Sequence, residues 1–388
     1  MPDLASPDTY VDGPPHEQFA ELRRTSPVHW NDGDECFWAV LKHADVEQVA
    51  RDPRTFSSAT GGVVLEDLPP DRLEQMRGML LAMDPPRHRE VRRPVVSHLT
   101  PRQVTRLEDD IRAICRDIFA AADGDVDFVA DVAAKLPTRV IGQVMALPAG
   151  DWDHIHALAE RITRGQDPAF ATDPESAGRA SQEMGLYAFQ LATAREAEPA
   201  GSDLTSVLLA AHDPVEFAML FVQLVTAGQD TTATLLSSGL LALLQHPDQL
   251  AALRADPTLL PTAVEEVLRY ANPLHYFRRT ATCDTELNGV AIRAGDKVAM
   301  YYTSANRDED VFTEPQVFDV RRTPNRHLSF GVAEHFCVGA HLARLEARVF
   351  FDELLATFPT IELAGPPTRV RSNLNNALRS LPLRLVRR

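Results

Sequence analysis

The sequence predicts a mainly α-helical protein with a smaller β region, an α+β fold. One apolar stretch, bounded by Asp213-Pro214 and His246-Pro247, is long enough for a single helix of ~50 Å. Other helical patterns occupy most of the chain between residues 102 and 270. Patterns typical of strands are confined to roughly residues 25–60, 273–300 and 370–388.

The composition limits the classes of protein to consider. The chain has 388 residues, 44% of them hydrophobic, and its formal net charge of −16 argues against a nucleic-acid partner. It contains no run of ~18 apolar residues, and its first ten residues have neither a basic nor an apolar segment. We therefore expect no signal peptide and no membrane anchor. The four cysteines are scattered, as in proteins of the reducing cytoplasm, so we expect a cytoplasmic location. We also expect a monomer.

Short elements make up the N-terminal part of the chain. Two β-rich runs flank Asn31-Asp32-Gly33-Asp34, which predicts a hairpin. Residues 57–82 fit no single regular element, and their apolar patch 63–65 should pack against the rest of the protein. Asp84, followed by two prolines, is expected to cap the next helix. The other helices are predicted at residues 16–24, 44–51, 102–122, 136–147, 149–164, 175–197, 261–270 and from Cys337 to about 357.

The long helix carries an unusual polar cluster. The helix is apolar on most sides, which predicts that it is buried. Polar residues nevertheless gather at positions 226–232, and Gly228 costs ~1 kcal/mol in a helix interior relative to Ala. Small residues let a planar group and a diatomic ligand approach the backbone, and a buried acid beside a hydroxyl can relay protons. The alternative is a hydrogen-bonded helix kink without chemistry.

A single cysteine, Cys337, stands between a Phe-Gly turn and the start of a helix. The free N–H groups and the dipole of a helix N-terminus lower a thiol pKa, so the position suits one axial bond to iron. A lone cysteine is more often a small buried hydrophobe. Zinc is a further alternative, because His335, Cys337 and His341 lie close in sequence, but a structural zinc site requires a fourth ligand and none is near.

The stretch 327–344, with F-G-x-x-x-H-x-C-x-G followed by L-A, resembles the haem-binding loop of the cytochrome P-450 family. Three other motifs resemble that family in the same order along the chain: H-x-x-x-R, A-G-x-[D/E]-T and E-x-x-R. The resemblance covers residues 10–388 and implies the cytochrome P-450 fold, with a long central helix over the haem, in a single domain of residues 1–388. One position differs. The family usually has a second glycine where this chain has Ala333, and we expect a negative φ there.

The resemblance also implies roles for individual residues. Haem b would be held by the thiolate of Cys337 as axial ligand to the iron. Thr231 would hydrogen-bond dioxygen, and Asp230 would pass protons inward. Glu266, Arg269 and Arg322 would form a buried structural triad, although the Glu–Arg pair alone could equally be a surface ion pair worth little. The cofactor-binding residues would be His88, Arg92, Arg279 and His335, which would bind the propionates, together with Ala227, Phe330, Gly331 and Gly339.

The implied function is that of a haem monooxygenase. It would use O2 and two externally supplied electrons to hydroxylate a mid-sized hydrophobic substrate: a steroid, a terpene, a fatty acid or a natural-product intermediate. Since no flavin or Fe–S motif is present, a ferredoxin and its reductase are the expected donors. Two alternatives stay open: an enzyme that couples aromatic or peptide-derived partners, and a non-catalytic haem or zinc binder. The candidate docking residues for a ferredoxin, which is usually acidic, are Arg87, Arg89, Arg93, Arg102, Arg326 and Arg344.

Substrate contacts are expected from segments of the long helix, of the strand region and of the two flanking turns. The segment Phe277-Arg278-Arg279-Thr280 resembles that of family members acting on steroids, terpenes and fatty acids. The polar residues instead favour a substrate with hydrogen-bonding groups, such as an aromatic or peptide-derived natural product, and both interpretations stay open. The candidates are Val64, Leu65, Val225, Gln229, Leu274, His275, Tyr276, Asn375 and Asn376.

Overall fold

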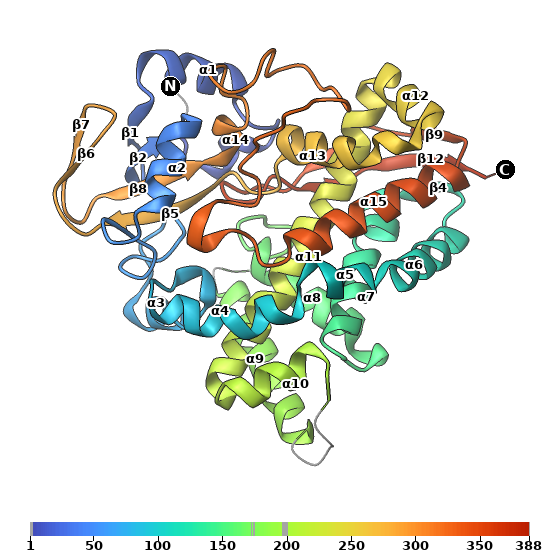
Figure 1. Ribbon diagram of the computed structural model, residues 1–388, viewed down its shortest axis with the longest axis horizontal. Helices are drawn as coiled ribbons and strands as arrows, with labels where there is room; N and C mark the ends of the chain where they lie inside the picture. Colours follow the sequence, from blue (N-terminus) through green and yellow to red (C-terminus); the bar gives the residue numbers. More distant parts are fainter. Residues whose placement is uncertain (1–2, 172, 174, 196–200, 388) are drawn as a thin grey trace.

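The structure is a computed structural model, and it describes residues 3–171, 173, 175–195 and 201–387. Residues 196–197 of the helix predicted at 175–197, and residue 388 of the C-terminal strand region, lie outside the described residues. Figure 1 shows one long helix, α11, running through the middle of the molecule. One group of strands, β1, β2, β5 and β8 with the β6–β7 pair, lies at the left of the view, and β4, β9 and β12 lie at the right, with helices around both groups. The architecture is the predicted mainly α fold with a smaller β region.

Helix α11 spans Pro214–Gln245, in agreement with the prediction. The Asp213 carboxylate caps it by accepting hydrogen bonds from the N–H groups of Val215 and Glu216, and Pro214 occupies the first turn. Most of its side chains from Phe217 onwards are buried, because α7, α8, α9, α13 and α15 pack around it. A helix enclosed in this way can present different faces to different neighbours.

The other helices surround α11. Most of them follow the predicted ranges, but the run predicted at 102–122 is divided into two helices. Four short helices of the described residues, α3, α10, α12 and α14, were not predicted. Helix α12 was missed because Pro247 indicated only the end of α11, whereas the same proline begins α12. The bounds are α1 His16–Thr25, α2 His43–Arg51, α3 Pro70–Arg77, α4 Arg87–His98, α5 Pro101–Thr105, α6 Glu108–Ala121, α7 Lys135–Val144, α8 Trp152–Thr163, α9 Ser176–Arg195, α10 Leu204–Ala211, α12 Pro247–Ala255, α13 Leu260–Ala271, α14 Tyr302–Ala305 and α15 Ala340–Thr357.

The main sheet has five strands in the order β1-β2-β8-β5-β3. The predicted hairpin is confirmed, since β1 and β2 pair antiparallel with Val28 opposite Val40. Strand β2 then pairs parallel with β8, which joins two distant parts of the chain. The bounds are β1 Val28–Asp32, β2 Cys36–Val40, β3 Phe56–Ser57, β5 Tyr276–Ala281 and β8 Lys297–Tyr301.

Smaller sheets complete the β region. The C-terminal strand β12 lies between β4 and β9 and is antiparallel to both. Strands β6 and β7 form a hairpin, and β10 pairs with β11. Of these, β4 and β9 were not predicted. The bounds are β4 Gly124–Asp127, β6 Thr285–Leu287, β7 Val290–Ile292, β9 Thr360–Leu363, β10 Thr368–Arg369, β11 Leu378–Ser380 and β12 Pro382–Val386.

Asp84 does not cap α4, which corrects the sequence prediction. Helix α4 begins only at Arg87, and no side chain caps it. The Asp84 carboxylate instead accepts hydrogen bonds from the Ser57 hydroxyl and from the Ser58 N–H at 2.8 Å. These bonds tie the end of β3 to the turn that leads into α4.

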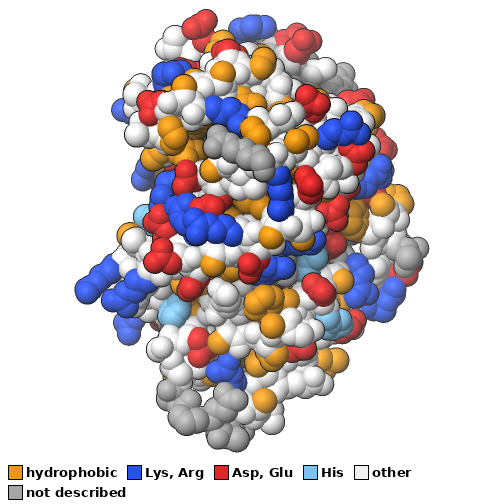
Figure 2. Space-filling model, turned by 90° about the vertical axis from the view of Figure 1, so that its right-hand side faces the viewer, with side chains coloured by type: hydrophobic (Ala, Val, Ile, Leu, Met, Phe, Trp, Pro, Cys, Tyr) orange, Lys and Arg blue, Asp and Glu red, His pale blue; other side chains and the backbone are white. Residues whose placement is uncertain are grey.

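The surface carries many ion pairs. Figure 2, which views the face at the right of Figure 1, shows acidic and basic side chains intermingled. Exposed pairs such as Arg384 with Asp125, 2.8 Å apart, keep the two signs together. Within the described ranges, no helix combines the length and the apolar character that crossing a membrane would require.

Candidate active site

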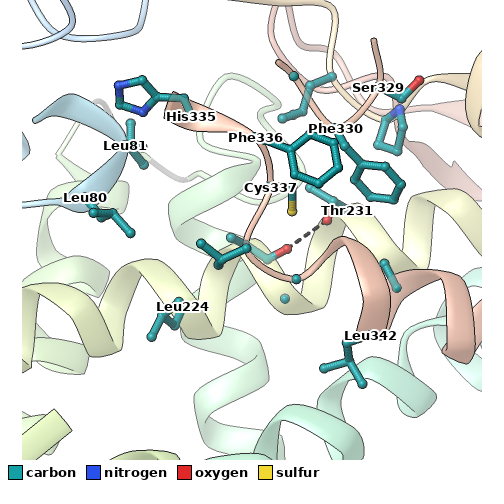
Figure 3. A pocket seen from close by; sticks show the side chains of 18 of the residues that line it. Leu80, Leu81, Leu224, Thr231, Ser329, Phe330, His335, Phe336, Cys337 and Leu342 are labelled. Atoms are coloured by element: carbon teal, nitrogen blue, oxygen red, sulfur yellow. Dashed lines mark hydrogen bonds between the residues drawn. The ribbon is translucent and has the colours of Figure 1, made fainter. Parts of the chain in front are cut away.

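A cavity of about 240 Å³ lies beside the middle of α11. Its walls come from α4, from α11, from β5, from the loop 328–339 and from the first turns of α15. Figure 3 shows Cys337 on the loop before α15 and Thr231 on α11 among the side chains that line it. Sequence positions more than a hundred residues apart thus face one space.

The loop 328–339 positions the Cys337 thiol. The backbone N–H of Cys337 donates to the Phe330 carbonyl at 2.8 Å. Between these two residues Gly331, with a φ of +67°, turns the chain. Gly339 lies next to the thiol, and a Cβ there would be in ordinary van der Waals contact with the Cys337 sulfur at 3.9 Å. Of the residues predicted to bind a cofactor on sequence grounds, Ala227, Phe330, Gly331, Cys337 and Gly339 all line the cavity.

The expected lowering of the Cys337 thiol pKa is not met. Burial raises the pKa of the thiol above its ordinary value. The Gly339 N–H and the guanidinium groups of Arg92 and Arg344 act in the opposite direction, as a helix end and nearby cations should, but burial outweighs them. A metal ion bound to the sulfur would deprotonate it outright.

The three residues of the zinc alternative do not meet. His335 and Cys337 line the cavity, but His341 lines a separate hollow beside Pro101 and Arg348. In the described part of the chain, no group of three His, Cys, Asp or Glu side chains is arranged to hold a metal ion. The position of His341 therefore removes the ligand set on which the zinc alternative depended.

Four nitrogen-bearing side chains line the cavity together, as the sequence predicted: His88, Arg92, Arg279 and His335. The His88 and His335 rings lie 4.2 Å apart, centre to centre. His88 is fully buried, and among the described residues neither of its ring nitrogens has a hydrogen-bond partner. Burial lowers the pKa of His88 to about 4, with a further lowering by Arg92. Buried donors of this kind are suited to bind carboxylates.

The predicted acid–hydroxyl pair is divided between two environments. Thr231 lines the cavity, and its hydroxyl donates to the Ala227 carbonyl at 2.8 Å (Figure 3). Asp230 is buried but does not line the cavity. Its carboxylate binds the buried guanidinium of Arg164 at 2.8 Å, and Arg164 also binds Glu160 at 2.8 Å. The acid is thus joined to the end of α8 on the far side of α11.

The predicted triad assembles in the core. Arg269 and Glu266, both fully buried, are 2.7 Å apart, and Arg322 approaches the same carboxylate at 3.1 Å. Arg269 also donates to the carbonyls of Asn306, Pro315 and Val317. The triad therefore holds the irregular segment that leads to the loop of Cys337, and the surface ion pair considered as an alternative is excluded.

Of the nine predicted substrate contacts, only Leu274 lines the cavity. Strand β5 explains part of this result, because successive side chains point to opposite faces. Phe277 and Arg279 face the cavity, so Tyr276 faces away from it. There the Tyr276 hydroxyl accepts the N–H of Leu65 at 3.2 Å, and the segment with Val64 packs over the same side.

The remaining candidates also serve other contacts. Val225 and Gln229 lie one turn apart on a face of α11 that is turned away from the cavity, and Gln229 contacts His156 of α8. His275 binds the Thr303 hydroxyl at 3.1 Å. Asn375 and Asn376 fix the C-terminal turn by donating to backbone carbonyls. These polar side chains are buried in the framework, which removes most of the support for a polar substrate pocket.

Several residues that line the cavity were not predicted from the sequence. Leu80 and Leu81 belong to an apolar run directly before the helix of His88, and this position was a usable signal. Gln223 and Leu224 lie about two helical turns before Thr231, on the same face of α11. Glu346 of α15 also lines the cavity, and nothing in its sequence context indicated that.

Comparisons with known proteins agree with this arrangement. A family model described as cytochrome P450 matches residues 192–379. A putative cytochrome P450 126 of Mycobacterium tuberculosis is 40% identical over 412 residues, covering 99% of this chain and 97% of the relative. The chain belongs to the cytochrome P450 family. Linalool 8-monooxygenase of Pseudomonas putida is 36% identical to this P450, with 99% of each chain covered.

A solved structure shows the same fold. A Mycobacterium marinum cytochrome P450 in complex with pseudoionone superimposes on this P450 with a TM-score of 0.89. The two are 39% identical, and the match covers 95% of this chain and 94% of the other. Together with the relatives, it confirms the predicted cytochrome P-450 fold and the predicted class, a haem-dependent monooxygenase that binds haem b through a cysteine thiolate.

The residues present fit this cofactor. The cavity of this P450 joins one thiol with two guanidinium groups and two neutral imidazoles, and the unpartnered nitrogens of His88 face it. An iron porphyrin needs a sulfur ligand and donors for its two carboxylates. The chemistry of this donor set matches both requirements.

Ala333 adopts a backbone conformation that was not expected. Its φ is +60°, in the left-handed region, whereas a negative value was predicted. The loop therefore keeps the path that a glycine would take, at a cost on the order of 1 kcal/mol for the alanine Cβ.

We expect Ala333→Gly to stabilise the protein by up to about 1 kcal/mol, because glycine adopts this φ without steric cost. Thermal unfolding of the holoprotein, together with the rate of haem loss, measures the effect. Ala149→Gly is the control, since Ala149 is exposed in a short right-handed helical turn, and it should destabilise by about 0.5–1 kcal/mol. Equal destabilisation by both substitutions would contradict the expectation.

Glu346 is a buried carboxyl group without a countercharge. It is 2% exposed, and its Oε2 has no hydrogen-bond partner among the described residues. Burial raises its pKa to about 8. The folded protein therefore retains a proton that the unfolded chain releases above its ordinary pKa near 4.5.

Because this pKa is raised in the folded state, stability should fall as the pH rises from about 4.5 to about 8 and then change no further through this group. We expect Glu346→Gln to remove that loss of stability. The free energy of unfolding of the variant should exceed that of the parent by a few kcal/mol at pH 8.5 but not at pH 4.5, because glutamine has no proton to release on unfolding. Denaturant unfolding across this pH range measures it. The exposed Glu362→Gln is the control, and parallel pH curves for parent and Glu346→Gln would refute the assignment.

Proposed function

We propose that this P450 hydroxylates an apolar isoprenoid substrate, such as a terpenoid. The observation that carries the proposal is the lining of the cavity. Apolar side chains dominate it, among them Leu80, Leu81, Leu224, Leu274 and Phe277. Since the polar residues once expected there lie outside the lining, a substrate rich in hydrogen-bonding groups would leave those groups unpaired.

One relative and one solved structure support the same class. One relative is a linalool monooxygenase and one solved structure contains pseudoionone, and both compounds are terpenoid chains with a single oxygen function. Gln223 is suited to bind such an oxygen. It lines the cavity, and its Oε1 already accepts a long hydrogen bond of 3.4 Å from the Leu81 N–H, which leaves the amide NH2 as the donor toward substrate.

The roles of the site residues form part of the proposal. Haem b, when bound, supplies the iron at which dioxygen is reduced. We assign the axial sulfur to Cys337 and the propionate donors to His88, Arg92, Arg279 and His335. The Thr231 hydroxyl holds a proton at the cavity wall. Asp230 replenishes that proton, and Arg164 holds the Asp230 carboxylate in place.

Substrate-binding difference spectra of the holoprotein test the proposed class. Linalool and pseudoionone should displace water from the haem and shift its spin state, and 18O from labelled O2 should appear in the product. Aromatic dipeptides serve as the comparison, because a coupling enzyme would bind them and would transfer no label. A spin-state response to the dipeptides alone would refute the terpenoid proposal.

Replacing Thr231 by Ala should leave electron and oxygen consumption within about twofold of the parent, while product formation falls about tenfold or more, because proton delivery is lost. Thr226→Ala is a matched control. Its hydroxyl makes the same type of bond, to the Val222 carbonyl at 2.8 Å on the same helix, but it does not line the cavity. Full coupling of oxygen use to product in the Thr231 variant would exclude the relay.

Electrons are proposed to come from a ferredoxin that docks near the loop of Cys337. Of the six candidate arginines, Arg87, Arg89 and Arg344 are engaged by carboxylates of this chain. Arg93, Arg102 and Arg326 have no carboxylate partner within 4.0 Å among the described residues, so their charge is available to an acidic partner.

The cytoplasmic location and the monomeric state remain predictions.

Charge reversal tests this docking site. Arg93→Glu with Arg102→Glu should raise the KM for the ferredoxin about tenfold or more at low salt, with kcat little changed, because steering and complex formation are weakened. Arg293→Glu provides the control, since Arg293 is exposed beside the β6–β7 hairpin. An unaltered KM in the double variant would count against the site.

A further inference from the structure

Three arginines that do not line the cavity lie near the short helix α14 and the start of α1. Arg23 comes from α1, Arg307 follows α14 directly, and Arg369 ends β10. Arg23 and Arg307 are only 2% and 5% exposed. Arg23 donates to the carbonyl and hydroxyl oxygens of Ser304 at 3.2 and 3.1 Å, and the Arg307 N–H donates to the same carbonyl at 2.9 Å. The Ser304 carbonyl thus joins two buried arginines, Arg23 through its guanidinium group and Arg307 through its backbone N–H.

The positive charge of these arginines is only partly balanced. Arg23 pairs with Glu309 at 2.9 Å. Arg307 binds neutral oxygens only, the Gln316 amide and the Tyr270 carbonyl, and it stacks on the Tyr270 ring. Arg369 binds the amide oxygen of Asn376 at 3.0 Å. No carboxylate of the described residues lies within 4.0 Å of Arg307 or Arg369, although a guanidinium group keeps its charge at any ordinary pH.

Two imidazoles complete the group. His275 binds the Thr303 hydroxyl on α14, and its ring packs on Tyr10 with centroids 4.3 Å apart. His16 begins α1. Arg369 lies beside the chain that leads into α1, since a Cβ at Gly13 would stand 3.4 Å from its Nε. Burial lowers the pKa of His16 well below its usual value, and the positive charges of Arg307, Arg23 and Arg369 lower it further. Both imidazoles are neutral at physiological pH and can donate an N–H without adding charge.

Each of four side chains in this group keeps one polar atom without a hydrogen-bond partner in the described residues. The atoms are Nη2 of Arg23, Nε of Arg307, Nδ1 of His16 and Nε2 of His275. Both arginine atoms are N–H donors, and a buried donor that stays unpaired destabilises the folded protein. Water would satisfy the donors, but it would leave the excess positive charge unbalanced.

We propose that this group, the α14 cation cluster (His16, Arg23, His275, Arg307 and Arg369), binds a small inorganic anion. Chloride and phosphate share the required chemistry, a compact negative charge that accepts N–H donors. The bound anion links α1 and the end of β10 to the chain around α14. It thereby fastens both terminal parts of the chain to the segment that leads, through the Glu266 triad, to the loop of Cys337.

Thermal unfolding of the holoprotein tests the site. The protein is first exchanged into sodium gluconate, whose bulky anion should not fit. Sodium chloride or sodium phosphate is then added at constant ionic strength. A saturable rise in Tm with one of these anions is expected, because a ligand that binds only the folded state stabilises it in proportion to its occupancy. The two titrations distinguish a halide site from an oxyanion site.

Variants connect the response to the cluster. Arg307→Gln should abolish the anion-dependent part of the Tm rise, whereas Arg384→Gln, at an exposed ion pair on β12, should keep it. If Arg307→Gln does not fold, crystals of the parent protein soaked in sodium bromide give a second measurement, with an anomalous peak expected within hydrogen-bond distance of Arg23 and Arg307. No anion-specific rise in Tm and no bromide peak, with ordered water only at this position, would overturn the proposal.

Discussion

A single buried carboxylate organises the approach to the active site of this P450. Glu266 accepts hydrogen bonds from Arg269, Arg322 and Asn325, and also from the backbone N–H of Asp319. A charge buried to this depth is tolerated only when its lone pairs are satisfied, so the partners cannot move independently. The chain between residues 306 and 325 has little regular structure, and these bonds replace the order that a helix or a strand would give it.

The loop of Cys337 depends on that order. Asn306, at the start of the segment, donates to the Ser329 hydroxyl and accepts the N–H of Leu328, while Ser329 in turn binds the carbonyl of Leu268 on α13. The thiol is therefore fixed through the backbone, with its cavity closed on the other side by α11. The loop of Cys337 is held rigidly on one side of the cavity, while α11 lines the opposite wall with small residues such as Ala227 and Gly228.

Sequence motifs predicted the cavity residues at positions where the chemistry allows only one or two amino-acid types. Cys337, Thr231 and the four nitrogen-bearing side chains of His88, Arg92, Arg279 and His335 face one cavity. Each is placed by its own helix, strand or turn, and the order of those elements can be read from the chain. The substrate contacts could not be read in this way. Whether Tyr276 or Phe277 faces the cavity depends on the register of β5 against β8, which is a tertiary property. The thiol pKa was missed for a related reason, since burial is not encoded in the residues adjacent to Cys337.

The bond between Arg164 and Asp230 has a consequence for motion. Arg164 stands at the end of α8, whereas Asp230 belongs to the helix that lines the cavity. Separating α8 from α11 would leave the charges of Arg164 and Asp230 buried and unpaired. That costs several kcal/mol unless water enters to solvate them. Opening the protein on this side therefore means hydrating the interior of α11 next to Thr231. Under the proposed proton relay, access from solvent and the supply of protons would be two outcomes of one equilibrium.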